Sequence, residues 1–229
     1  GLEAGAGLVI LCNPWNPVGR VLTEAEMRAL QELVSRYDAL VFSDEIHSPL
    51  VLGGRDFVSY ARMGAEFASH TITATAATKG WNIAGLPNAQ VIIPDEGLRE
   101  RWDSICQEKL PHSMSTIGAL GSIEAYTNGD EWQREIFEVI ECNIRAVSEA
   151  LASTKIDFHP PQATYLTWWG FEAYPQFGDS PASVLLERAH IAVNAGITLG
   201  ADYSKWARMN LACPPKVAEE MLSRVLGVL

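Results

Sequence analysis

The sequence has little positive charge and no long apolar run. Its 229 residues include 17 Lys and Arg against 28 Asp and Glu, which gives a formal net charge of −11, and basic tracts are absent. This balance argues against nucleic acid or an anionic membrane as a partner, because both attract clustered basic side chains. No apolar run approaches the roughly 20 residues that a membrane-spanning helix needs. We therefore expect neither a nucleic-acid-binding nor a membrane-embedded protein.

Cysteine is also scarce. The four cysteines, Cys12, Cys106, Cys142 and Cys213, lie far apart and form no C-x-x-C pair. Zinc sites usually include closely spaced cysteine or histidine ligands, and so few scattered cysteines fit a reduced compartment best, so we expect a cytoplasmic protein without a metal site. The chain starts at Gly1, shows no basic stretch followed by an apolar one, and enters a buried-type strand at once. We expect no export signal, and we expect the chain to be part of a longer protein.

The first half of the chain alternates short apolar runs with helical segments. Apolar or β-branched runs that indicate strands lie at 8–12, 39–45, 71–77 and 89–94. A helix is expected over about 23–37, because Thr23 and Glu26 have the spacing of a capping box. Short apolar strands separated by helices are typical of an α/β protein with a mostly parallel sheet that helices cover on both faces.

The second half has longer helices and fewer strands. Helical segments are expected at about 96–109, 113–127, 130–153, 181–191 and 215–228. The run TYLTWWGF at 164–171 indicates a strand. This mixture predicts a smaller α+β domain after the sheet domain. We place the domains at residues 1–128 and 129–229, with the boundary inside the long helical region.

Polar side chains follow three of the expected strands. Asn16 follows the first, Asp44 and His47 follow the second, and Lys79 follows the third. Open parallel sheets bind their ligands beyond the carboxyl ends of the strands. We therefore expect an amide, an acid, an imidazole and an amine to converge at one edge of the sheet.

This combination of side chains suits pyridoxal 5′-phosphate. A lysine amine can form a Schiff base with a bound aldehyde. A carboxylate beside the pyridine nitrogen keeps that nitrogen protonated, so that the ring accepts electrons. An amide can hydrogen-bond the phenolic oxygen of the ring. The interpretation assigns the amine to Lys79, the acid to Asp44 and the amide to Asn16.

Four motifs, in this order, resemble those of the pyridoxal-phosphate-dependent class I/II aminotransferase family of fold type I. They are NPWNPVGR at 13–20, DEIH at 44–47, TKGWNIAGL at 78–86 and RMNLA at 208–212. The second and third resemble in particular the cystathionine β-lyase-like C–S lyase branch of that family. The resemblance spans nearly the whole chain and implies the PLP-dependent transferase-like fold. Residues 1–128 would then be the C-terminal part of the large cofactor-binding domain, and residues 129–229 the small C-terminal domain.

The resemblance also implies a role for each matching residue. Lys79 corresponds to the lysine that bonds to the cofactor and later moves the Cα proton, Asp44 to the partner of the pyridine nitrogen, and Asn16 to the amide near the phenolic oxygen. Arg208 corresponds to the arginine that grips the substrate α-carboxylate with two hydrogen bonds, a geometry that Lys does not reproduce. His47 lies where many aminotransferases have Tyr and where the lyase branch is similar to this sequence in having His.

Two positions near the lysine differ from the usual pattern of the family. Ala76 stands where a small hydroxyl residue or Gly is usual, and Pro87 stands where a basic residue usually reaches the cofactor phosphate. Thr78 still offers a hydroxyl beside Lys79 and is therefore a cofactor-binding candidate. Family members also carry an N-terminal region with a glycine-rich phosphate loop, which we expect this chain to lack. They dimerise, so a homodimer is expected here.

Taken one at a time, these residues have ordinary structural explanations as well. Asn16 beside proline and glycine could simply form a turn. Asp44 and Glu45 could end a strand in water, and Arg208 could be a surface ion-pair residue. Trp81 is expected to pack rather than to take part in catalysis.

The resemblance implies an enzyme that acts on a small amino acid. The first hypothesis is a pyridoxal-phosphate-dependent C–S β-lyase for cystathionine-like or cysteine-derived amino acids, with thiol, pyruvate and ammonia as products. One alternative is an aminotransferase that uses the same residues. The other is a non-catalytic sensor or regulatory domain that keeps the fold.

Overall fold

The computed structural model of the chain describes residues 1–109 and 115–229, without the side chains of 107–109. Two compact units make up the chain. The first consists of residues 1–15 and 20–133, and the second of residues 16–19 and 134–229. The division between the units falls after Gln133, inside a helix, whereas the domain boundary after residue 128 stays a prediction.

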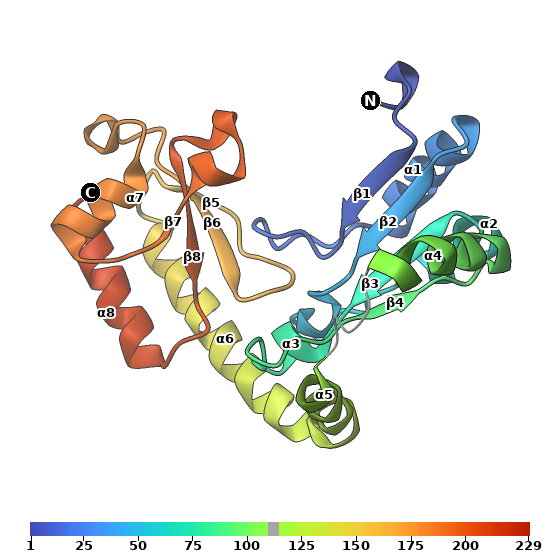
Figure 1. Ribbon diagram of the computed structural model, residues 1–229. Coiled ribbons are helices and arrows are strands. Elements are labelled where there is room, and N and C mark those ends of the chain that lie inside the picture. The colour runs from blue at the N-terminus through green and yellow to red at the C-terminus, as the bar shows by residue number, and fades with distance from the viewer. Residues whose placement is uncertain (110–114) are drawn as a thin grey trace. The chain divides into compact units, whose positions relative to one another are not determined.

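A four-stranded sheet of order β1-β2-β3-β4 forms the centre of the first unit (Figure 1). The strands are β1 (Leu8–Cys12), β2 (Leu40–Asp44), β3 (Thr71–Thr75) and β4 (Gln90–Ile92). The first three strands pair in parallel, and β4 runs antiparallel to β3. This sheet with its flanking helices confirms the predicted α/β class and the mostly parallel sheet.

Helices flank this sheet on both faces (Figure 1). The helices of the first unit are α1 (Glu24–Arg36), α2 (Ala65–Ala68), α3 (Ala77–Gly80), α4 (Glu96–Lys109) and α5 (Thr116–Asn128), with short 3-10 turns η1 (Leu2–Ala4), η2 (Ser48–Leu50) and η3 (Tyr60–Met63). On one face, Leu11 and Val41 pack against Met27 and Val34 of α1 and against Phe67 of α2. Helix α5 was expected from about residue 113, and its first two expected residues lie outside the described part of the chain.

The opposite face of the sheet is only partly covered. Ile72 packs there against Ile93 and against Leu98 of α4. Ile10 shares this face, because it pairs in register with Phe42, which pairs with Ile72. Its side chain is 73% exposed, and that of Leu8 is 48% exposed. The helical cover on this face therefore stops short of β1.

The second unit contains an antiparallel sheet of order β5-β6-β8-β7. Its strands are β5 (Asp157–Phe158), β6 (Leu166–Gly170), β7 (Asn194–Ala195) and β8 (Trp206–Asn210). Its helices are the part of α6 (Asp130–Leu151) after residue 133, α7 (Pro181–Val184) with a π-helical turn (Leu185–Ala189), and α8 (Pro215–Leu226), with 3-10 turns at Pro175–Phe177, Gly196–Leu199 and Ala201–Tyr203. Every residue of β6 is buried, which agrees with the strand expected at 164–171.

The sequence did not predict three of these strands. β5 and β7 are two residues long, too short for a periodic pattern. β8 buries only Ala207 and Met209, and a half-buried Arg208 lies between them. Over the described residues, no helix combines the length and the apolar character required to cross a bilayer.

Helix α1 begins at a complete capping box, as predicted. Thr23 Oγ1 accepts a hydrogen bond from Glu26 N at 3.3 Å, and Glu26 Oε2 accepts one from Thr23 N at 2.9 Å. Arg20 also donates a hydrogen bond to the Glu26 carboxylate. The backbone bond from Thr23, followed by the side-chain bonds from Arg20 and Thr23, lowers the pKa of Glu26 from 4.5 to about 2.

A depressed pKa in the folded protein makes the contribution of Glu26 to stability depend on pH. The contribution is present above the unfolded-state pKa and is lost as the pH falls through the folded-state pKa. We expect Glu26→Gln to lower the free energy of unfolding at neutral pH, and the difference from the parent protein to shrink as the pH falls from 4.5 toward about 2. Urea unfolding followed by circular dichroism measures both quantities. Glu32→Gln, at an exposed position of the same helix, is the control and should show no such convergence. A deficit for Glu26→Gln that is independent of pH would contradict the assignment.

Candidate active site

The carboxyl ends of β1, β2 and β3 are tied together by their backbones. Cys12, Asp44 and Ala74 lie side by side in register. Asn13 N donates to Asp44 O at 3.0 Å, and Glu45 N donates to Ala74 O at 2.8 Å. The residues that follow each strand therefore leave the sheet at one edge.

Asp44 is the last residue of β2 and is half-buried. Its Oδ1 accepts a hydrogen bond from Ile46 N at 3.2 Å, so the side chain closes the turn that ends the strand. His47 follows in this turn and is buried. Its carbonyl oxygen accepts from Leu50 N at 2.9 Å, which starts the short turn η2.

Lys79 lies in α3, the single helical turn that follows β3. Thr78 beside it is buried, and Lys79 itself is half-buried. Gly80 makes close packing with η2 possible, because a Cβ atom there would lie 2.7 Å from Pro49 Cβ. The segment that carries Lys79 therefore packs directly against the segment that follows Asp44 and His47.

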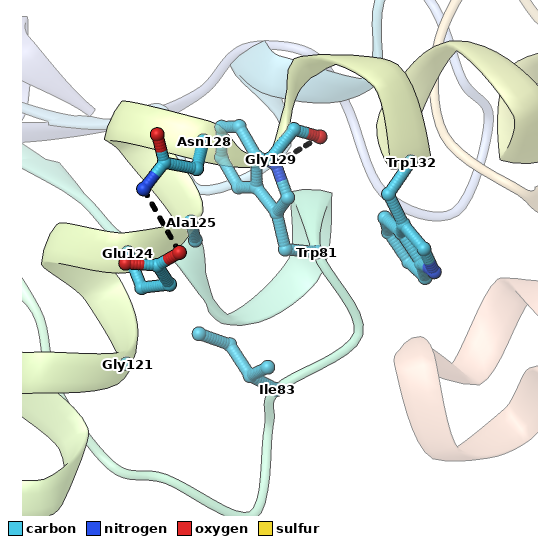
Figure 2. Close-up of a pocket in the computed structure, with 8 residues that line it drawn as sticks. All are labelled: Trp81, Ile83, Gly121, Glu124, Ala125, Asn128, Gly129 and Trp132. Atoms are coloured by element: carbon cyan, nitrogen blue, oxygen red, sulfur yellow. Dashed lines mark hydrogen bonds between the residues drawn. The ribbon is translucent and has the colours of Figure 1, made fainter.

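A mostly apolar hollow of about 360 Å³ lies beside the lysine segment (Figure 2). It is lined by Trp81, Ile83, Gly121, Glu124, Ala125, Asn128, Gly129 and Trp132. The indole of Trp81 donates to Gly129 O at 3.1 Å and packs edge-on against Tyr126, with ring centroids 5.1 Å apart. Trp81 is thus a packing residue, and none of the predicted site residues belongs to this lining.

In the second unit, two amide oxygens orient the guanidinium group of Arg208. Nη1 donates to Asn16 Oδ1 at 3.0 Å, and Nη2 donates to Asn194 Oδ1 at 3.0 Å. Nε is buried and has no hydrogen-bond partner among the residues that the structure describes. An N–H group in this position can still donate to a further acceptor, and a carboxylate is the acceptor that best matches a guanidinium.

The positive charge of Arg208 also reaches Tyr165, at the residue before β6. Burial raises the pKa of the Tyr165 hydroxyl, and the charge of Arg208 opposes this rise. A negative ligand group beside Arg208 would therefore enter a positively charged environment.

Residues 16–19, which include Asn16, are fastened at Gly19 to the rest of the second unit. Gly19 O accepts hydrogen bonds from Gln162 N at 2.8 Å and from Ala163 N at 2.9 Å. Gly19 has a φ of +71°, and a Cβ atom there would lie 2.3 Å from Pro161 Cβ and 2.7 Å from Ala163 O. Only glycine allows both this backbone conformation and this close approach.

Sequence reasoning missed two residues near these sites. Glu45 was considered a possible solvated strand end, and this is wrong, because its side chain is only 4% exposed. The alternation of β2 could have indicated this, since Glu45 follows Ser43 and Val41 on the core-facing side. Asn194, which holds Arg208, gives no signal in the sequence. Among residues 1–109 and 115–229, no three His, Cys, Asp or Glu side chains gather as metal ligands.

The class of protein follows from a match to a known family over nearly the whole chain. The family model for aminotransferase class I and II matches residues 2–225. The chain therefore belongs to this family, which confirms the resemblance of its four motifs and the fold that the resemblance implied.

Several individual proteins of known name are similar to this chain. The chain is 32% identical over 225 residues to a cystathionine beta-lyase of Corynebacterium glutamicum, an alignment that covers 98% of this chain and 60% of that protein. It is 31% identical to cystathionine beta-lyase PatB of Bacillus subtilis, covering 97% of this chain and 58% of the relative. Its structure is similar to that of cystalysin from Treponema denticola, which contains a pyridoxal 5′-phosphate cofactor. The TM-score is 0.92 at 27% identity, and the match covers 99% of this chain and 59% of cystalysin. The chain thus spans about 60% of the length of the curated relatives it matches.

The fastening at Gly19 can be tested by substitution. Gly19→Ala adds a methyl group against Pro161 and Ala163 and requires an L-residue at positive φ. We expect it to lower the free energy of unfolding by roughly 2–4 kcal/mol, the combined cost of overpacking and of the left-handed conformation. Gly54→Ala is the matched control, because Gly54 has a φ of +63° but nothing within 4 Å of the added Cβ. It should cost about 1 kcal/mol for conformation alone. Equal losses in the two variants would contradict the close packing.

Proposed function

We propose that the chain belongs to a pyridoxal-phosphate-dependent C–S β-lyase. The substrate would be a cystathionine-like or cysteine-derived amino acid, and the products thiol, pyruvate and ammonia. The proposal is supported most by one observation: Asp44, His47 and Lys79 follow adjacent strand ends on segments that pack together. They do so in a chain about one third identical to proteins named cystathionine beta-lyase.

The residues present fit the cofactor. Asp44 uses Oδ1 for the Ile46 amide, which leaves Oδ2 as an acceptor for a pyridine N–H. Lys79 supplies the amine, and the Thr78 hydroxyl and the His47 imidazole are further polar groups on the two packed segments. When bound, pyridoxal 5′-phosphate supplies an aldehyde for the amine and an electron-poor ring that accepts the electron pair left at the substrate Cα.

Each side chain then has a defined task. Arg208 binds the substrate α-carboxylate with the N–H group that has no acceptor among the described residues, while Asn16 and Asn194 keep the guanidinium oriented. Lys79 takes the Cα proton as a general base. Asp44 holds a proton at the ring nitrogen, an effect that grows as negative charge develops. Loss of the Cα proton allows the bond between Cβ and sulfur to break, with sulfur leaving as a thiolate.

An aminotransferase is the second candidate, and the description of the family favours it. Both reactions begin with removal of the Cα proton, so the same residues serve both. A non-catalytic sensor or regulatory domain is the third. Ala76, which is buried, and Pro87 favour it, because neither offers a side-chain donor to a phosphate group.

We also propose that the whole protein is a cytoplasmic homodimer. The apolar side chains of Ile117, Leu120 and Ile123 on α5 are each more than 60% exposed, which supports a face that another surface covers. The family resemblance supports a second copy of the protein as that partner.

The first test concerns Lys79. Adding pyridoxal 5′-phosphate to the protein should produce the visible absorption band of a Schiff base, and Lys79→Ala should abolish that band. Lys205→Ala is the control, because Lys205 forms a surface ion pair with Glu172 at 3.3 Å. It should leave the band intact. A band that survives in Lys79→Ala would exclude Lys79 as the bonding amine.

The second test separates the candidate reactions. Incubation with cystathionine should release thiol and pyruvate without an added 2-oxo acid, whereas a requirement for a 2-oxo acid would indicate transamination. Arg208→Lys should lower kcat/KM roughly 10- to 100-fold, because one charge-assisted hydrogen bond contributes about 1.5–3 kcal/mol. Arg224→Lys, at a surface arginine that pairs with Glu220, is the control. Cofactor binding without turnover of any amino acid would favour the sensor hypothesis.

A further inference from the structure

The DEIH motif contains an acid that the proposed reaction does not use. Glu45 directly follows Asp44, yet its carboxylate is buried on the other side of the strand. Its Oε1 accepts three hydrogen bonds: from Ser43 Oγ at 2.8 Å, from Ser59 Oγ at 2.9 Å and from Tyr60 N at 3.2 Å.

Burying a carboxylate is costly unless it is well hydrogen-bonded. Burial removes water from the carboxylate and raises the pKa of Glu45. The hydrogen bonds from Ser43, Ser59 and Tyr60 lower this pKa. The charge of the adjacent Asp44 adds a smaller rise. The three donors therefore surround this one carboxylate oxygen and compensate for part of the cost of burying it.

These donors join parts of the chain that are distant in sequence. Ser43 belongs to β2, whereas Ser59 and Tyr60 begin the turn η3. Tyr60 is fully buried and packs edge-on against Phe67 of α2, with ring centroids 5.0 Å apart. The Glu45 side chain thus anchors the end of β2 in the layer that covers one face of the sheet.

The backbone of Glu45 is held as well. Its N–H donates to Ala74 O at 2.8 Å, and its carbonyl oxygen accepts from Ser48 N at 2.9 Å. The residue after Asp44 is therefore fixed to β3 and to the turn that carries His47. Side chains alternate along a strand, so anchoring Glu45 toward one face directs Asp44 toward the other.

We propose that Glu45 is a positioning residue for Asp44, whose carboxylate it keeps in one direction by fastening the end of β2 to Ser59 and Tyr60. The use of Asp44 by a cofactor rests on the proposed function. The fastening of the strand end does not depend on it.

Hydrogen exchange tests the fastening in the protein without added cofactor. Glu45→Gln keeps the size of the side chain but replaces the charged carboxylate acceptor of these hydrogen bonds by a neutral amide oxygen. We expect the backbone amides of residues 45–48 and of Tyr60 to exchange about 10-fold faster or more, because a charged acceptor is lost. Ser59→Ala keeps the carboxylate, removes one donor and should cause a smaller increase in the same amides. It also provides the test if Glu45→Gln does not fold.

Thr71→Val is the matched control for general loosening. It removes another buried hydrogen bond from the same face of the sheet, from Thr71 Oγ1 to Phe67 O at 2.6 Å, but at the opposite end of β3. Faster exchange should then be confined to the neighbourhood of residues 67–71. Unchanged exchange at 45–48 in both Glu45→Gln and Ser59→Ala would overturn the proposal.

A double-mutant cycle tests whether Glu45 acts through Asp44. Asp44→Asn and Glu45→Gln should each weaken the binding of pyridoxal 5′-phosphate, measured by visible absorbance titration. The double variant should bind no more weakly than Asp44→Asn alone, since a positioning residue has no effect without the group it positions. Additive losses would overturn the positioning role. If the parent protein binds no pyridoxal 5′-phosphate, the proposed function fails, and the exchange experiment still decides whether Glu45 fastens the strand end.

Discussion

The parallel register of β1, β2 and β3 is the constraint on which the candidate site depends. Cys12, Asp44 and Ala74 lie side by side, so the segments that follow them leave the sheet at the same edge. A shift of one residue in β2 would exchange the two faces of the strand. Glu45 would then lose its buried donors, and Asp44 would turn into the core. Hydrophobic packing of the β2 residues Val41 on one face and Phe42 on the other opposes that shift.

In each of the two units, charged side chains near the candidate residues are held by hydrogen bonds to other polar groups. Arg208 is oriented by two amide oxygens, one of which comes from the loop that Gly19 fastens. Glu45 is satisfied by three donors from two segments. Buried or half-buried groups of this kind lose much of their freedom to rotate, because breaking their hydrogen bonds away from water is costly. Preorganised side chains are what binding a small charged substrate requires.

Membership in the aminotransferase class I and II family accounts for the fold and for the order of the motifs. The choice between lyase and transaminase chemistry depends on what happens after the Cα proton is removed. The roles proposed for Asp44, Lys79 and Arg208 would be the same in either reaction, so these residues alone do not distinguish the products. Identity with cystathionine beta-lyases over nearly all of this chain favours carbon–sulfur cleavage.

Local features of the sequence by themselves determined much of this protein. The α/β class, the cap of α1 and the polar residues after each parallel strand follow from short-range patterns, since hydrophobic periodicity and capping chemistry act within a few residues. Only the tertiary structure decided that β4 runs antiparallel, that Glu45 is buried and that Asn194 holds Arg208. Each of these depends on which distant segment packs beside which, and a local pattern carries no information about a partner far away in the chain.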